Sequence, residues 1–319
     1  MEAIKNLIII SDTHAGCQLG LCPPEGAKLD EGGTYMPNKI QREIWEHWLD
    51  FWDNWVPQVT HGEPYAVLLN GDAIDNEHHG SSHQWSHNTK DQRRCAERIL
   101  WPVREKASEM FFTRGTSVHD GESGREIEEL ARDLRATPND SGQYARHDIR
   151  IRVGKALVHA LHHIGTTGSS AHEASAVNSE LTASYVDAAR WGYEPPDYVV
   201  RSHRHRAIVV DLDAAGGYAA GIVTPGWQGK TPFAFRVPGG RVTTPQWGGF
   251  CIRQGDEEHY YRRKVYSIEP SKEVVLCVPT NGLPKSKNSK RRHADSRRAN
   301  LRNVRARASR RRVRSSSKA

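Results

Sequence analysis

The chain has 319 residues, which exceeds one average domain but suits a single-domain α/β enzyme, and no apolar stretch approaches the roughly 20 residues of a membrane span. Its five cysteines are an odd number without a Cys-x-x-Cys pair, so they indicate neither a disulfide framework nor a zinc ribbon and favour the reducing cytoplasm. The net charge of +7 is uneven: residues 285–319 hold 15 Lys or Arg and one acid, a charge of +14, which leaves 30 basic and 37 acidic residues, or −7, in the rest.

The first half of the chain alternates short apolar runs with amphipathic helical patterns. Residues 38–59 carry aromatic and aliphatic side chains at offsets of three, four and seven, which predicts a helix whose stripe packs into a core rather than binding a ligand. Two more helices are predicted at about 89–107, where Pro102 should kink or interrupt the helix, and at about 124–135. The Gly- and Pro-rich residues 16–37 have no clear period and predict a surface excursion.

Apolar runs typical of β-strands recur along the chain and dominate its second half. One predicted helix, residues 172–191, interrupts them and ends at Gly192. The first run, residues 7–10, is too short for the apolar region of a signal peptide. A pair of sheets flanked by helices accounts for this distribution, so the sequence predicts an α/β fold. The predicted strands are residues 7–10, 66–69, 110–112, 146–153, 156–161, 198–200, 206–212, 217–224, 249–253 and 259–267.

Residues of the types that bind divalent metals follow five of these apolar runs. Strand ends fix the geometry of such residues, while the loop that follows leaves a coordination position open. One coincidence of this kind is weak, since Gly-Asp also forms turns and His-x-His also ends solvated strands. Five in order point to a two-metal hydrolase. The segments are Asp12 with His14, Gly71-Asp72, Gly115 to Asp120, His162-His163, and His203 with His205.

Two metal ions about 3.5–4 Å apart need a bridging carboxylate and several neutral imidazoles. Asp72 is the natural bridge, because Gly71 before it allows a close approach of the backbone. Asp12 and His14 can reach one ion together. The imidazoles of His203 and His205 share one side if the segment is extended, whereas a turn there directs them at neighbouring ions.

Over about residues 6–212 these motifs resemble those of the calcineurin-like metallophosphoesterase family. The family pattern runs D-x-H, G-D-x-x-D, G-N-H-[DE], a histidine at a strand end, and G-H-x-H. The resemblance implies a four-layer α/β/β/α metallophosphoesterase sandwich. The matching segments are Asp12-x-His14, Gly71-Asp72-x-x-Asp75, Gly115 to Asp120, His162-His163, and Ser202-His203-x-His205.

The resemblance also implies a role for each matching residue. Asp12, His14 and His205 hold the first metal and Asp72 bridges. His203 and either His162 or His163 hold the second, with His162 favoured because the first histidine of the family segment is the usual ligand. His119 faces the leaving group as transition-state stabiliser or general acid, and Asp120 orients it.

The third and fifth motifs depart from the family pattern. The metal-binding Asn is missing from the third, which places Thr116 and Ser117 ahead of Val118 and His119. A Thr116 hydroxyl, a backbone carbonyl or a water takes the Asn position, which predicts weaker affinity for the second metal. Gly-Thr variants of this motif resemble those of some bacteriophage-encoded members. In the fifth motif Ser202 replaces Gly, which is a milder change.

The loop from 76 to 87 adds His78, His79, His83 and His87. Near Asp72 these histidines can contact the substrate phosphate or an accessory ion, or they are incidental members of a polar loop, which we favour. We expect Asp75 to be a structural hydrogen-bond acceptor rather than a ligand.

The last residues have a different character from the rest. Residues 281–319 lack an apolar period and predict a disordered Lys/Arg-rich tail after a domain of residues 1–280. Its cations suit salt-dependent binding to nucleic acid without reading of sequence. Contact with acidic partners or improved solubility are the alternatives. The absence of aromatic residues argues against base stacking.

The sequence therefore predicts a cytoplasmic, metal-dependent phosphoesterase in which a hydroxide shared by two divalent ions attacks phosphorus. The ions are Mn, Fe, Zn or Mg, since mixed carboxylate and imidazole ligands suit several metals. The basic tail favours a phosphodiesterase or nuclease that acts on nucleic acid. The alternatives are a phosphomonoesterase or small-nucleotide phosphatase, and a non-enzymatic nucleic-acid-binding protein on a vestigial phosphoesterase fold.

Overall fold

The computed structural model describes residues 3–78, 80–121, 123–165, 170–214, 217–268 and 273–275. The chain divides into one compact unit, Met1–Pro270, and a second unit, Ser271–Ala319. Residues 281–319, the predicted tail, lie outside the described residues, so the boundary at 280 stays a prediction. None of the described helices is long and apolar enough to cross a membrane.

The first sheet combines the strands predicted in the first half with the last hairpin of the compact unit. Its order is β13-β12-β1-β4-β5-β6. The strands from β1 to β6 run parallel, and β12 joins the other edge of β1 in antiparallel register. The strands are β1 (Asn6–Ile10), β4 (Ala66–Asn70), β5 (Glu109–Thr113), β6 (Ala145–Arg146), β12 (Gln246–Gln254) and β13 (His259–Ser267).

The second sheet contains the other predicted strands, in the order β10-β11-β9-β8-β7. Two antiparallel hairpins, β7–β8 and β10–β11, flank the parallel strand β9. The strands are β7 (Ile149–Val153), β8 (Ala156–Ala160), β9 (Tyr198–Arg201), β10 (Ile208–Ala214) and β11 (Gly217–Val223). Nine of the ten predicted strands are confirmed, whereas the strand predicted at 146–153 is divided: Arg146 ends β6 in the first sheet, and β7 in the second sheet begins only at Ile149.

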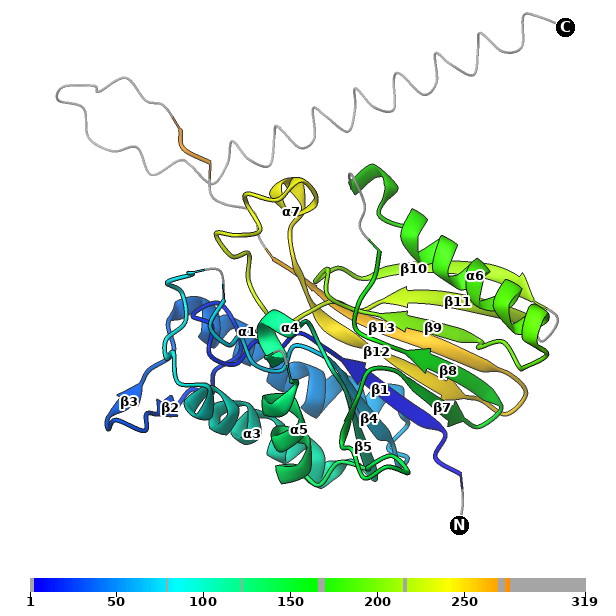
Figure 1. Cartoon of the computed structure of the whole chain (residues 1–319), viewed down its shortest axis with the longest axis horizontal. Coiled ribbons are helices and arrows are strands. Elements are labelled where there is room, and N and C mark those ends of the chain that lie inside the picture. Colours follow the sequence, from blue (N-terminus) through cyan, green and yellow to red (C-terminus); the bar gives the residue numbers. More distant parts are fainter. Residues whose placement is uncertain are drawn as a thin grey trace, which may run out of the picture. The chain divides into compact units, whose positions relative to one another are not determined.

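The side chains of β1 show how the layers stack, because they alternate between two cores. Leu7 and Ile9 belong to the core between the two sheets, whereas Ile8 and Ile10 belong to the core that packs against helices. On the outer face of the second sheet, α6 (Ser175–Trp191) buries Val177 among residues of β10 and β11. Figure 1 shows α1, α3 and α5 on one side of the sheets and α6 on the other. The predicted α/β/β/α sandwich is confirmed.

The predicted helices are present, but Pro102 does not interrupt its helix as expected, and the first helix contains a π-helical turn. Asn38 caps α1 in a capping box with Gln41. The first predicted helix continues from α1 through a π-helical turn into α2, and its aromatic stripe is core, as expected. Pro102 does not interrupt α3, which runs on to Lys106 with Leu100 and Val103 buried. The elements are α1 (Lys39–Leu49), η1 (Asp50–Trp55), α2 (Val56–Val59), α3 (Thr89–Lys106) and α5 (Arg125–Asp133).

Five short elements were not predicted. The strands β2 and β3 pair inside the Gly- and Pro-rich excursion. The single turn α4 holds the third metal-type motif, and α7 lies between β11 and β12. The elements are β2 (Ala27–Lys28), β3 (Thr34–Tyr35), α4 (Ser117–Asp120), η2 (Ser170–His172) and α7 (Pro238–Val242).

Candidate metal centre

A buried chain of hydrogen bonds joins the ends of five strands from both sheets. The Thr113 hydroxyl at the end of β5 donates to Asn70 Oδ1 at the end of β4, at 2.7 Å. Asn70 Nδ2 donates to Ser202 Oγ after β9, at 2.6 Å. The Ser202 hydroxyl bonds that of Thr224 after β11, which bonds that of Ser11 after β1, both at 2.7 Å. All five residues are fully buried, so this chain fixes the loops that follow these strands.

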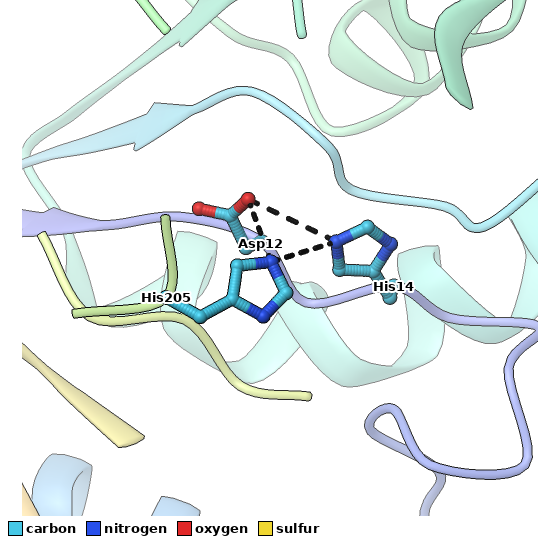
Figure 2. A group of neighbouring side chains, drawn as sticks. All are labelled: Asp12, His14 and His205. Carbon is cyan, nitrogen blue, oxygen red and sulfur yellow. Dashed lines mark hydrogen bonds and ion pairs between the residues drawn. The ribbon is translucent and has the colours of Figure 1, made fainter. Parts of the chain in front are cut away.

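The first group of ligand-type atoms comes from Asp12, His14 and His205, in the loops after β1 and β9. The Nε2 atoms of His14 and His205 are 3.3 Å apart, and Asp12 Oδ1 is 3.2 Å from His205 Nε2 and 3.8 Å from His14 Nε2 (Figure 2). Asp75 Oδ1 accepts a hydrogen bond from His14 Nδ1 at 3.1 Å, which turns Nε2 inward. Three donor atoms therefore surround one point, as a metal site requires.

The second group comes from Asp72, His162 and His203. His162 Nε2 is 3.0 Å from Asp72 Oδ2, and His203 Nδ1 is 3.9 Å from the same oxygen. His162 Nδ1 donates to the Asn70 carbonyl at 2.7 Å, so its Nε2 faces the group. His163 is exposed and lies outside the group, although its ring centroid is 5.8 Å from that of His203. The geometry thus places His162, and not His163, at the centre.

Asp72 connects the two groups. Its carboxylate also forms a cluster with His14 and His119, in which His119 Nε2 is 3.9 Å from Asp72 Oδ2. It therefore has neighbours from the first group through His14 and from the second through His162. This is the place that a bridging carboxylate occupies between two ions.

The backbone of these residues is strained. Asp12, His14, Asp72, His203 and His205 have φ values of 54°, 42°, 52°, 71° and 51°. A residue other than glycine in this left-handed region costs of order 1–3 kcal/mol and persists only where its surroundings impose it. Five of the predicted ligands therefore share a costly conformation, which is typical of functional sites.

Close backbone contacts around Asp72 leave no room for side chains at two glycines. A Cβ at Gly71, where φ is 84°, would lie 2.3 Å from His162 Nδ1. A Cβ at Gly115 would lie 2.0 Å from Asp72 Oδ1. The close approach predicted at Gly71 is confirmed, and Gly115 has the same function in the third motif.

The electrostatics of the centre favour a cation. Burial alone raises the pKa of Asp12 and Asp72, but the neighbouring histidines outweigh it and hold both pKa values well below the usual range. Burial lowers the pKa of His14 and His162, but the carboxylates raise these values to about 10 and about 9. The carboxylates are thus ionised and attract positive charge, which a bound metal ion supplies when the imidazoles are neutral.

Two ligand-type atoms of the centre have a charged neighbour but form no hydrogen bond among the described residues. Asp12 Oδ1 and His162 Nε2 are buried and accept or donate no hydrogen bond there. A buried polar atom without a partner costs about 1–3 kcal/mol. One such atom lies in each group, so a metal ion in each group satisfies both, and the residues fit a two-metal centre.

Thr116, in the place of the missing Asn, contacts the bridging carboxylate. Its N–H donates to Asp72 Oδ1 at 2.7 Å and its hydroxyl donates to the same oxygen at 3.2 Å. Its carbonyl accepts from the N–H groups of His119 and Asp120, at 3.0 and 2.9 Å, in the turn α4. The Thr116 carbonyl thus accepts the hydrogen bonds of the turn α4, and the Thr116 hydroxyl orients the Asp72 carboxylate.

His119 is oriented by a different residue from the one expected. Its Nδ1 donates to the backbone carbonyl of Asp75 at 2.7 Å, whereas the bonded oxygen of Asp120 accepts from the Gly115 N–H. The expectation that Asp120 orients His119 was wrong, because adjacent residues on a helical turn point about 100° apart. Burial lowers the pKa of His119 to about 4, and burial followed by the Asp72 charge raises that of Asp120 to about 7.

The histidine loop contributes one residue to the centre. The His78 ring lies 4.7 Å from that of His119, and His83 forms a further cluster with Cys17 and Asp75. His87 is exposed, and His79 lies outside the described residues. Asp75 is the expected hydrogen-bond acceptor: besides His14, the amides of Gln84 and Gln228 donate to it at 2.7 and 3.1 Å.

A cavity of about 770 Å³ opens above the centre. Its floor includes His14, Asp72, His119, His203 and His205, as the sequence predicts for a shared site. Its walls were not predicted. They come mainly from residues 228–245, which carry no motif, together with two arginines of the loop after β9. They include Arg204, Arg206, Gln228, Lys230, Phe233 and Val237.

Comparisons with known proteins give only distant likenesses. The sequence matches no protein-family model and no curated protein. The structure is similar to Vps29 from Entamoeba histolytica in complex with Zn²⁺, with a TM-score of 0.34 and 10% identity over 82% of this chain and 98% of that one. It is similar to Vps29 from Cryptosporidium parvum, with a TM-score of 0.32 and 10% identity over 84% and 100%. It is also similar to the Thermotoga maritima protein TM1076, with a TM-score of 0.35 and 11% identity over 82% of this chain and 100% of that one. Scores this low leave the fold to rest on the strand order and layers described above.

Replacement of Gly115 by Ala tests the close contact at the centre. The added Cβ would collide with Asp72 Oδ1, so we expect divalent-metal affinity to fall by roughly 10–100-fold, as when a supporting contact of a metal ligand is lost. Equilibrium dialysis with Mn²⁺ measures the affinity. In the control Gly165→Ala the new Cβ meets its nearest neighbour, the Ala176 Cβ, at 3.6 Å. Equal affinity in the two variants would contradict the prediction.

Proposed function

We propose that the chain is a metal-dependent phosphoesterase with two divalent ions. Asp12, His14 and His205 hold one ion, His162 and His203 hold the other, and Asp72 lies between them. The observation that carries the proposal is the convergence of two ligand groups on one buried carboxylate, with five of the ligands held in a strained backbone. The candidate ions are Mn, Fe, Zn and Mg, since no ligand selects one of them.

The chemistry divides between the ions and the protein. When bound, two ions would supply an activated water and stabilisation of the charge on the phosphoryl oxygens. Thr116 keeps the Asp72 carboxylate in place through its N–H and hydroxyl. Because the Asp75 carbonyl can only accept, His119 donates through Nδ1 and turns Nε2 toward the centre. Nε2 of the neutral ring is an acceptor, so His119 acts on the leaving oxygen only as the imidazolium, which gives its Nε2 proton to that oxygen and returns to the neutral ring.

The basic charge of residues 285–319 supports our choice of nucleic acid as the substrate. Residues 285–319 have a charge of +14 beside an acidic remainder of −7. Such a segment binds polyanions through release of counterions. We therefore infer a phosphodiester substrate in nucleic acid, with phosphomonoesters and small nucleotides as the second candidate, and we place the reaction in the cytoplasm.

Asp72→Asn tests the bridging carboxylate. The change keeps the side-chain shape but removes the charge, so we expect metal-dependent hydrolysis to fall roughly 100-fold or more, since even an outer contact of a ligand is worth about 10–100-fold. Metal-stripped protein is restored with Mn²⁺, Zn²⁺ or Mg²⁺ and assayed on bis(p-nitrophenyl) phosphate and p-nitrophenyl phosphate. The matched control is Asp256→Asn, at an exposed position. Absence of metal-dependent hydrolysis in the parent would favour a non-enzymatic protein.

His119→Asn tests proton donation to the leaving group. General acid catalysis is worth about 10²–10⁴-fold and matters most for a basic leaving group. We expect a large loss of kcat for an alkyl phosphodiester and a small loss for a p-nitrophenyl ester. His87→Asn, which changes an exposed histidine, is the control. Equal losses on both substrates would show that His119 does not donate the proton.

Removal of residues 285–319 tests the tail. We expect KM for single-stranded DNA at low salt to rise, because the deletion removes 15 cationic side chains. Hydrolysis of bis(p-nitrophenyl) phosphate should not change, and the salt dependence of KM for DNA should become shallower. If both substrates respond equally, the tail has no part in substrate binding.

A further inference from the structure

The residues between β11 and β12 form a wall beside the metal centre, which we define as residues 227–246 and call the wall segment. Its first residue, Trp227, donates its backbone N–H to the Asp12 carbonyl at 2.9 Å. Its last residue, Gln246, donates its N–H to the His205 carbonyl at 2.8 Å. Both ends of the wall segment are therefore fixed to backbone groups of residues in the first ligand group. Figure 1 shows α7 (yellow) on this excursion from the sheets.

Contacts in its middle hold the wall segment in place. Lys230 Nζ donates to the Arg241 carbonyl at 2.7 Å, which links the two sides of the excursion. Arg206 donates to the Thr244 carbonyl and to Glu173 Oε1, both at 3.1 Å. The wall is thus tied both to itself and to the loop that carries His203 and His205, so it is formed before a ligand arrives.

The wall segment presents apolar side chains to the cavity. Phe233, Ala234, Val237 and Pro245 line it together with the histidines of the metal centre. Phe233 remains 48% exposed even though it lines a cavity, so part of this residue is accessible to a ligand. Phe235, two residues on, does not line the cavity, and the Lys230 ammonium lies 4.3 Å from its ring centroid. One side of the cavity is therefore built for an anion and another for an apolar group.

We propose that Phe233 and Val237 bind the organic group of the phosphoester, and that this group is a nucleobase. The inference rests on the proposed function, which places the phosphate on the floor. An exposed aromatic ring stacks on any base, and the Thr231 hydroxyl in the same cavity, which accepts from the Ala234 N–H at 3.3 Å, can still donate to a base edge. The volume of about 770 Å³ lies within the range of about 300–1,000 Å³ that encloses a ligand of this size. The cavity thus takes one nucleoside phosphoester at a time.

Two substrates that are identical at phosphorus test the wall. Thymidine 5′-(p-nitrophenyl phosphate) and methyl p-nitrophenyl phosphate share a leaving group and differ only in the nucleoside. Because loss of one stacked base weakens binding about tenfold or more, Phe233→Ala should lower kcat/KM about tenfold for the thymidine ester. It should change the value for the methyl ester less than twofold. Phe235→Ala is the matched control, since this phenylalanine is 55% exposed and outside the cavity.

A binding measurement, which does not depend on hydrolysis, tests the nucleoside site separately from the proposed function. Mn²⁺-loaded protein is titrated calorimetrically with thymidine 5′-monophosphate and with inorganic phosphate. Phe233→Ala should weaken the nucleotide about tenfold and leave phosphate unchanged. If this selectivity is present and neither ester is hydrolysed, the proposed function fails and the nucleoside site stands. If the parent binds the nucleotide no more tightly than phosphate, or if Phe233→Ala affects both esters equally, the inference is overturned.

Discussion

The loops that carry the two groups of ligand-type residues depend on the buried chain of hydrogen bonds that crosses from one sheet to the other. Hydroxyl and amide groups at this depth are costly unless each has a partner, so the chain through Asn70 and Ser202 admits few arrangements of the strand ends. Asn70 also donates to the Leu161 carbonyl and accepts from His162 Nδ1. Through its side-chain amide and its backbone carbonyl, Asn70 thereby sets the distance between the strand that precedes Asp72 and the loop that carries His162. Ser202, at the position where the calcineurin-like pattern has glycine, contributes its hydroxyl to this chain of hydrogen bonds.

This rigidity explains how the strained backbone is maintained. Five ligands in the left-handed region cost several kcal/mol together, and a flexible loop would relax. Here His14 is held by Asp75, and Asp72 is held by Thr116. The mutual pKa shifts of the carboxylates and imidazoles show that the centre is also electrostatically coupled. Geometry and charge therefore reinforce each other, and a cation between the groups relieves both the orphaned atoms and the crowded imidazoles.

Much of the fold and the floor of the site followed from the sequence, because both depend on local patterns. Buried strands are apolar runs, and ligands follow them directly, so order along the chain predicts convergence. Contacts between distant segments were harder. His162 and His163 are adjacent in sequence, and the structure distinguishes them because His162 is buried, donates to the Asn70 carbonyl and contacts Asp72. Asp120 is adjacent to His119 in sequence, yet the partner of His119 is the distant Asp75 carbonyl. The walls of the cavity lack any periodicity or motif, since their shape comes from tethers at their ends.

The hydrogen bonds at the two ends of the wall segment link the proposed binding site for the organic group to the proposed metal centre. The ends of the wall segment are bonded to the Asp12 and His205 carbonyls, so two residues of the first ligand group also set where Phe233 lies. A group bound at the wall is then placed at a fixed distance from the phosphorus on the floor. Catalysis of displacement depends on alignment to within about 1 Å, and such alignment contributes several kcal/mol to lowering the barrier. Variation in this one irregular segment can therefore change the substrate while the ligands below it stay the same.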